Sequence, residues 1–100
     1  MKLLTKELLK RIPKLFETEH DPDPMVYTKF FFPYSTWEWY VIEFDGEENF
    51  FGLVDGHEVE LGNFSLRELM RTQDHLGLPI ERDISFRPCR LSELKTQLRK

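Results

Sequence analysis

Three side chains that can bind a metal ion or transfer a proton lie close together in the chain, at His20, Asp21 and Asp23. An imidazole and carboxylate oxygens can act together in either role. However, no second histidine stands at an HxxxH or similar spacing. Pro22 and Pro24 stiffen the segment, and aspartates in such segments bond nearby backbone N–H groups. We therefore expect a structural turn and no metal, and we keep a small enzyme using a carboxylate or histidine of residues 20–23 as an alternative.

Other arrangements that usually indicate catalysis are weak in this sequence. The five glycines are scattered, and neither a GxGxxG nor a GxxxxGK[ST] phosphate-binding loop occurs. The single cysteine, Cys89, cannot form an internal disulfide and stands in an expected loop without a nucleophile signature, which favours a structural role. We therefore predict no catalytic residue and no cofactor.

Carboxylates recur two residues apart in the predicted strands, as in Glu43 with Asp45 and Glu58 with Glu60. Residues at this spacing share a strand face and lie about 6.6 Å apart, which suits general acid–base catalysis in a cleft. A domain of this size has little room for a substrate cleft beside its core. Solvated strand faces are therefore the favoured interpretation.

These carboxylates belong to a strongly acidic middle of the chain, which the formal net charge of −4 conceals. Residues 1–16 hold five basic residues and one acidic residue, residues 17–60 hold twelve acidic residues and one lysine, and residues 61–100 hold eight basic and five acidic residues. Such a block is either a solvated face or a surface for a cationic partner. Its charge density resembles that of duplex DNA, so such a protein could occupy a basic nucleic-acid-binding surface.

The pattern of apolar residues, caps and turns predicts the elements that position these side chains. Capping residues at Thr5 and Ser65, together with Pro13 as a stop, predict short helices near the N-terminus and over 65–72, and a third helix is expected at 92–98. Strands are expected over 26–32, 36–45, 49–54, 58–61 and 84–86. This order predicts a single α+β domain over residues 1–100, with an antiparallel four- to five-stranded meander sheet packed by N-terminal, middle and C-terminal helices.

Aromatic residues fill the predicted strands, and the strands around 39–42 and 50–54 are apolar on both faces. Sheets with exposed aromatic rings can stack RNA bases, but the carboxylates here would repel phosphates. We therefore expect no direct nucleic acid binding by this acidic face. We also expect one sheet face to be exposed or covered only by a partner.

Nothing in the sequence indicates a membrane protein. No apolar stretch approaches the roughly 20 residues needed to span a bilayer, and charges interrupt the N-terminus before a signal-peptide core. The apolar fraction of 40% is well above that of a disordered chain. A folded cytoplasmic protein with no membrane partner is therefore expected.

Six runs of sequence are distinctive: MKLLTKE at 1–7, EHDPDPMVY at 19–27, EFDGE at 43–47, FFGLV at 50–54, LGNFSL at 61–66 and LGLPIERD at 76–83. Together they resemble, over residues 1–98, a small bacterial family known only as a domain of unknown function. Members are commonly encoded on plasmids, integrative elements and phage. The resemblance implies a role in counter-defence or transfer, and it brings no catalytic residues.

The hypothesis that joins these observations is a non-catalytic interaction protein of a mobile genetic element. It would block a basic nucleic-acid-binding surface on a host-defence protein, such as a restriction or CRISPR component. The predicted contacts are one apolar anchor and seven carboxylates: Trp37, Glu43, Asp45, Glu47, Glu48, Asp55, Glu58 and Glu60. A structural module of a larger mobile-element protein is a further alternative. A cleft lined by His20 would favour an enzyme. An exposed apolar sheet face would favour a structural module, and a convex acidic face would favour the interaction protein.

Overall fold

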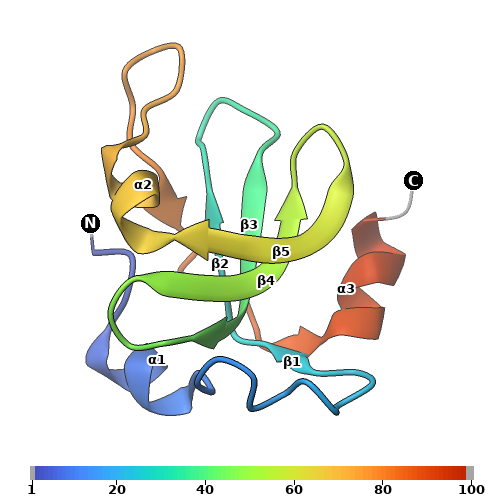
Figure 1. Ribbon diagram of the computed structural model, residues 1–100. Helices are drawn as coiled ribbons and strands as arrows, with labels where there is room; N and C mark the ends of the chain where they lie inside the picture. Colours follow the sequence, from blue (N-terminus) through green and yellow to red (C-terminus); the bar gives the residue numbers. More distant parts are fainter. Residues whose placement is uncertain (1, 99–100) are drawn as a thin grey trace.

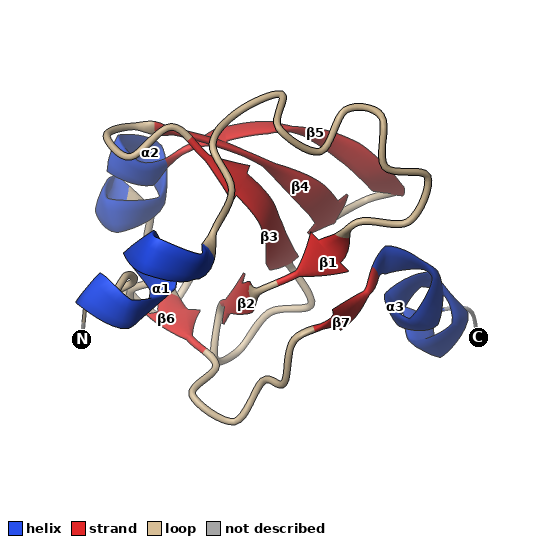
Figure 2. Ribbon diagram, turned by 90° about the horizontal axis from the view of Figure 1, so that it is seen from below, coloured by secondary structure: helices blue, strands red, loops and turns tan. Residues whose placement is uncertain are grey.

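An antiparallel sheet of five strands forms the centre of the protein, in the spatial order β5-β4-β3-β2-β6 (Figures 1 and 2). The computed structural model describes residues 2–98. Four strands that follow one another in the chain pair as a meander, and a short fifth strand lies beside the first of them. Their bounds are β2 Thr28–Phe31, β3 Glu38–Phe44, β4 Asn49–Asp55, β5 Val59–Ser65 and β6 Glu81–Arg82. The predicted α+β fold with an antiparallel meander sheet is confirmed.

Three short helices pack around the sheet, namely α1 Lys6–Arg11, α2 Leu66–Arg71 and α3 Leu91–Leu98. The predicted caps are present. The Thr5 Oγ1 accepts a hydrogen bond from the Leu8 N–H (3.1 Å), and the Ser65 Oγ accepts one from the Glu68 N–H (3.2 Å). None of these helices in the described part of the chain is long and apolar enough to cross a membrane.

Buried apolar side chains cover both faces of the sheet, and the helices lie on different sides of it (Figure 2). One cluster includes Trp39 and Val41 and extends to residues of the N-terminal segment and α2. The other includes Tyr40 and Ile42 and packs against Leu94 of α3. The expectation of an exposed sheet face is therefore wrong for β3, whose residues 39–44 are buried on both faces, whereas β4 is buried in part.

The segment predicted as one strand over residues 26–32 is divided between two sheets. Strand β1 (Met25–Val26) pairs with β7 (Cys89–Arg90) in a separate two-stranded sheet, whereas β2 joins the main sheet. Local propensity favours an extended chain throughout, but the choice of partner depends on a two-residue strand near the other end of the chain. The division is therefore decided by tertiary pairing.

The strand predicted over residues 84–86 is wrong, because these residues form a turn. The Asp83 Oδ1 accepts hydrogen bonds from the Ser85 N–H (3.0 Å) and the Ser85 Oγ–H (2.7 Å). Such an aspartate turn replaces strand pairing locally. The strand forms just before it, as β6.

A register shift in the middle of the sheet positions the candidate site. Strands β3 and β4 pair regularly as far as Val41 opposite Gly52, and pairing resumes with Glu43 opposite Phe51. Ile42 is therefore the extra residue of a β-bulge, a feature that bends a strand and redirects a side chain. Ile42 and Glu43 both line the same groove as a result.

Candidate functional site

A groove of about 460 Å³ lies on the α3 face of the sheet. Residues 15–24 form one wall, α3 contributes to another, and strands β3, β4 and β5 provide the floor. The lining is largely apolar, with Phe16, Phe51 and Leu61 among its members. Its charged groups are three carboxylates and one ammonium group, those of Glu19, Asp21, Glu43 and Lys95.

Glu43 is buried at this groove, with 4% of its surface exposed. Its Oε1 accepts a hydrogen bond from the Phe16 N–H (2.9 Å), and its Oε2 accepts one from the Thr18 N–H (2.9 Å) and another from the Thr18 hydroxyl. The carboxylate therefore holds the segment 15–18 against the sheet. The structure corrects the prediction that Glu43 is a surface contact, because the bulge turns its side chain inward.

Phe16 lies at the rim of the same groove in an unusual backbone conformation. Its φ is 70°, the left-handed region that residues other than glycine adopt infrequently, and its side chain is 73% exposed. The hydrogen bonds from the Phe16 and Thr18 amides to Glu43 hold the backbone there. An aromatic ring is thus presented to solvent beside an apolar groove.

The predicted contacts Asp45 and Glu48 serve the turn between β3 and β4. The Asp45 Oδ1 accepts hydrogen bonds from the Glu47 and Glu48 N–H groups (2.8 Å each) and from the Asn49 N–H (3.1 Å). The Glu48 carboxylate accepts hydrogen bonds from the Ser65 hydroxyl and the Arg67 N–H at the start of α2. Of the acidic residues in this turn, Glu47 is left as an exposed carboxylate without a hydrogen bond or ion pair in the described structure.

Stability at low pH is expected to depend on Asp45. Hydrogen bonds from the Glu48 and Glu47 amides, with a further contribution from Asn49, lower the pKa of Asp45 from 3.8 to about 2. A lowered folded-state pKa means that this stabilisation is complete above about pH 4 and is lost as the pH falls through 2. Thermal unfolding measured from pH 5 to pH 2 should therefore show a shallower loss in Asp45→Asn, which keeps an acceptor but does not titrate. An unchanged pH profile in the variant would contradict this assignment.

The other end of the sheet carries a different group of predicted contacts. Trp37 lies against the turn between β4 and β5, 5.3 Å from the His57 ring and 6.0 Å from the Trp39 ring between centroids. A Cβ on Gly56 would lie 2.3 Å from the Trp37 indole, so the glycine allows the ring to pack on the turn. We call Trp37, Asp55, Glu58 and Glu60 the acidic hairpin end.

The carboxylates of the acidic hairpin end have no basic partner among the described residues. No ion pair or side-chain hydrogen bond involves Asp55, Glu58 or Glu60 in residues 2–98. The neighbouring Glu38 differs, since it pairs with the Lys29 ammonium (2.8 Å) and accepts a hydrogen bond from the Tyr40 hydroxyl (2.7 Å). Within the described part of the chain, these three carboxylates therefore have no internal charge partner.

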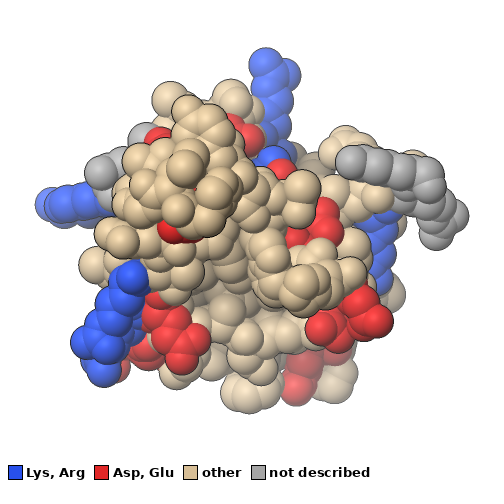
Figure 3. Space-filling model, turned by 90° about the horizontal axis from the view of Figure 1, so that it is seen from above, with Lys and Arg blue, Asp and Glu red and all other residues tan. Residues whose placement is uncertain are grey.

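The acidic residues do not form one surface. The turn at Asp45–Glu48 and the acidic hairpin end lie at opposite ends of the seven-residue strand β4, about 20 Å apart. At 0.1 M salt, charges separated by more than about 10 Å are largely screened from one another. Figure 3 shows one face of the molecule, on which carboxylates form separate groups and basic side chains project near the edges. Apart from the buried Glu43, the predicted acidic contacts therefore form two separate groups.

Residues 20–23 do not come together as a site. The His20 side chain is 94% exposed and lines neither described cavity. The Asp23 carboxylate instead accepts hydrogen bonds from the Ser92 N–H (2.8 Å) and hydroxyl (2.7 Å), which lower its pKa. Among the described residues, no group of three or more His, Cys, Asp or Glu is placed to hold a metal ion. This segment positions the start of α3.

The cysteine thiol is not set up as a nucleophile. Cys89 is half-buried in β7 against the α3-side apolar cluster. Burial, with a smaller contribution from the charge of Glu93, raises the pKa of the Cys89 thiol. Because the thiolate is the reactive form, the raised pKa disfavours nucleophilic chemistry at this position.

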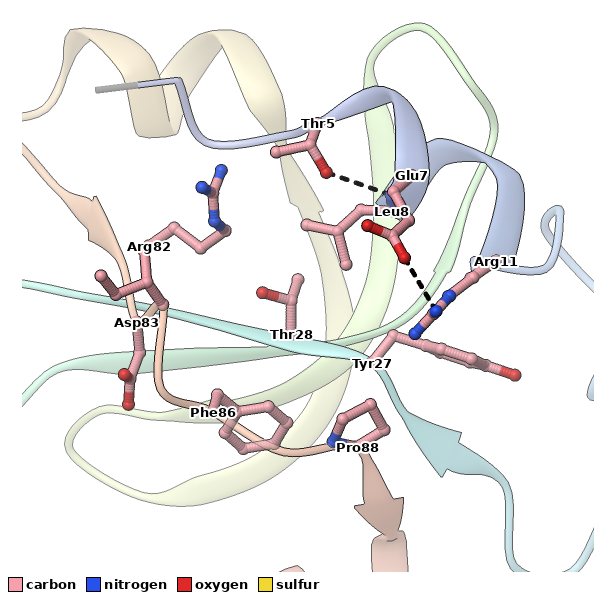
Figure 4. A pocket seen from close by; sticks show the side chains of 11 residues that line it. Thr5, Glu7, Leu8, Arg11, Tyr27, Thr28, Arg82, Asp83, Phe86 and Pro88 are labelled. Carbon is pink, nitrogen blue, oxygen red and sulfur yellow. Dashed lines mark hydrogen bonds and ion pairs between the residues drawn. The ribbon is translucent and has the colours of Figure 1, made fainter.

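A second cavity, of about 310 Å³, lies between α1, β2 and the segment after β6 (Figure 4). Its charged side chains already have partners. The Arg11 guanidinium pairs with the Glu7 carboxylate (2.8 Å), and the Arg82 guanidinium donates a hydrogen bond to the Lys2 carbonyl (2.6 Å). None of the predicted contact residues lines it. We therefore regard the groove and the acidic hairpin end as the stronger candidates.

A family model described as "Protein of unknown function (DUF2958)" matches residues 3–98. The chain belongs to this family. The resemblance seen in the sequence to a domain of unknown function, over nearly the full length, is thus confirmed. No curated protein and no solved structure matches the chain.

The candidate sites of this DUF2958 domain are therefore defined by the geometry of the chain itself. The residues of the acidic hairpin end were among the contacts predicted from the sequence, and they stay a prediction. The groove was not predicted, because it combines residues from distant segments. Pro22 and Pro24, which line the groove, indicated only a stiff turn in the sequence. The β-bulge that places Glu43 there has no recognisable sequence signature.

Proposed function

We propose that this protein is a non-catalytic interaction protein that binds a basic protein surface through its acidic hairpin end. The observation that carries the proposal is a set of three carboxylates without a basic partner among the described residues, those of Asp55, Glu58 and Glu60. They lie around the turn between β4 and β5, on which the half-buried Trp37 ring packs. Unpaired carboxylates raise the rate of encounter with a cationic surface. A partly exposed aromatic ring supplies the desolvated contact that gives affinity.

The partner is a protein whose basic surface handles nucleic acid, in the host-defence setting that the sequence resemblance implies. A restriction or CRISPR component is the specific form of this proposal. The two acidic groups lie at opposite ends of β4, so their carboxylates do not form one continuous row like the phosphates of DNA. We therefore limit the proposed DNA mimicry to one group of carboxylates. The contact is therefore proposed to be local, at one end of the sheet.

The test compares charge reversal at the two ends of the sheet. The double variant Glu58→Lys/Glu60→Lys is expected to fold normally, because both side chains are exposed, and to weaken capture of a basic bacterial protein about tenfold at low salt. The matched control Glu47→Lys reverses an exposed charge at the other end and should change capture less than about twofold. Capture from a bacterial lysate, with quantitative mass spectrometry at low and high salt, provides the measurement.

Equal capture of the same proteins by the wild type and the double variant would overturn the proposal. A third variant tests the anchor. Trp37→Ala should cost about 2 kcal/mol of binding free energy if the indole is buried in the complex. Circular dichroism of each variant checks that the fold is retained.

A further inference from the structure

Strand β5 is a long strand at an open edge of the sheet. It has seven residues and pairs with β4 on one side, and no strand of the described chain pairs with its other side (Figure 1). Outside that pairing, none of the turn, loop and cap hydrogen bonds of the described residues involves the backbone of residues 59–64. Val59 and Leu61 are 48% and 44% exposed. Such an edge is a template for pairing with another extended chain.

The direction of the backbone groups along β5 follows from two flanking hydrogen bonds. The Gly56 N–H donates to the Glu58 carbonyl (3.0 Å), and the Leu66 N–H donates to the Glu48 carbonyl (2.8 Å). The even-numbered residues between them therefore turn their N–H and C=O groups toward β4. Because this direction alternates, Val59, Leu61 and Asn63 turn theirs toward the open edge.

The side chains of the same strand alternate between two chemically different faces. Leu61 and Asn63 line the groove, and the groove also contains the exposed Phe16 ring. Glu60 lies on the opposite face, opposite Val54 of β4, and is exposed. A strand added outside β5 would meet an apolar surface on one face and a carboxylate on the other.

We infer that β5 binds an extended segment of a partner protein by strand addition, and that the segment alternates apolar residues with Lys or Arg. The inference rests on the proposed function and specifies how the basic partner is held. The residue of the added segment opposite Leu61 would exchange main-chain hydrogen bonds with β5, and its apolar side chain would lie along the groove. Residues opposite Glu60 would place cationic side chains beside the carboxylate. Main-chain bonds supply affinity and alternate side chains supply selectivity.

Charge favours an extended cationic segment, rather than a second copy of the chain, at the open edge of β5. A second copy would add its own acidic strand, with Glu58 and Glu60, to an edge that already carries these carboxylates. The groove adds Glu19, Asp21 and Glu43 against Lys95. A cationic segment lowers this repulsion, whereas a second copy increases it.

The experiment uses two short synthetic peptides with the same number of lysines. One alternates lysine with valine, and the other alternates lysine with proline, which removes the N–H groups that would bond to β5. The lysine–valine peptide is expected to bind, and the lysine–proline peptide to bind at least about tenfold more weakly, because it cannot complete the strand ladder. Calorimetric titration of the full chain measures both affinities.

Amide hydrogen exchange locates the bound peptide. At ten times the dissociation constant, the amides of Val59, Leu61 and Asn63 should exchange about elevenfold more slowly, because binding blocks the exposed donors. The peptide should leave the amide of Gly62, which already faces β4, nearly unchanged. Slowed exchange elsewhere, with no change at Val59, Leu61 and Asn63, would overturn strand addition.

Two substitutions at one position separate backbone pairing from side-chain contact. Leu61→Pro removes an outward N–H without removing a bond to β4 and should abolish the preference for the lysine–valine peptide. Leu61→Ala keeps the N–H and should retain that preference. If the wild type bound both peptides equally and the Glu58→Lys/Glu60→Lys variant bound both more weakly, strand addition would be overturned. The proposed function would then still stand, because binding would depend on the carboxylates alone. Binding of neither peptide would overturn strand addition, and the capture experiment decides the proposed function separately. Dimerisation of the chain through β5, seen by sedimentation, would also overturn the inference.

Discussion

Gly52→Ala is expected to destabilise the domain by about 3 kcal/mol or more, a large part of the total stability of a domain of this size. Gly52 lies in the middle of β4, opposite Val41 at the start of the bulge. A Cβ at this position would lie 1.8 Å from the Tyr40 carbonyl oxygen and 2.9 Å from its carbon. These are backbone atoms of a paired central strand, so they cannot move away without separating β3 from β4.

The matched control is Gly62→Ala. Gly62 is directly opposite Gly52 on the neighbouring strand, and a Cβ there would meet no atom within 4 Å. Alanine at this position should therefore leave stability nearly unchanged, or raise it by a few tenths of a kcal/mol through the loss of backbone freedom in the unfolded chain. Urea unfolding followed by circular dichroism compares the two variants. Similar unfolding midpoints for the two variants would show that the close approach of the Tyr40 backbone does not exclude a Cβ at residue 52.

Glu43→Leu is expected to destabilise the domain by about 2–4 kcal/mol, although leucine is apolar and of similar size. The substitution removes the acceptor of the Phe16 N–H, the Thr18 N–H and the Thr18 hydroxyl. A buried donor left without a partner costs about 1–3 kcal/mol, and partial access to water at the groove lowers the sum for these three groups. The segment 15–18 should also open locally, which faster amide exchange at Phe16 and Thr18 would detect.

Two controls make this prediction specific. Glu19→Leu changes a carboxylate that lines the same groove but is largely exposed, and it should alter stability by less than about 0.5 kcal/mol. In Thr18→Val, which already lacks the hydroxyl, Glu43→Leu should cost less than it does in the wild type, since the two residues share a hydrogen bond. Additive costs in this double-mutant cycle, or unchanged exchange at Phe16, would contradict the assigned role of Glu43.

Local chemistry in the sequence determined most of the secondary structure. Thr5 and Ser65 cap their helices because a side-chain oxygen can reach a backbone N–H a few residues later, whatever the rest of the fold does. The turn around Asp45 forms for the same reason. Consecutive strands joined by such short turns pair as neighbours, which is why the meander from β2 to β5 was predictable.

The sequence also showed where charge accumulates, but it did not show which carboxylates the fold buries or pairs. Glu43, Asp45 and Glu58 all carry a carboxylate, yet the first holds the segment 15–18 and the second closes a turn. The third has no partner among the described residues. That difference depends on a bulge and on donors brought from other segments. Local sequence does not indicate those donors, because they come close to the carboxylates only when the chain has folded.

The groove and the open edge of β5 were likewise decided by tertiary structure. The alternating pattern of residues 58–61 indicated a strand, but only the pairing order placed that strand at the edge and beside the 15–24 segment. Side-chain alternation is a local property of an extended chain, whereas the identity of its neighbour is a property of the whole sheet. Amino-acid sequence alone therefore determined the α+β meander and its acidic middle, and long-range packing decided which of those carboxylates are buried, which close turns and which lack a basic partner among the described residues.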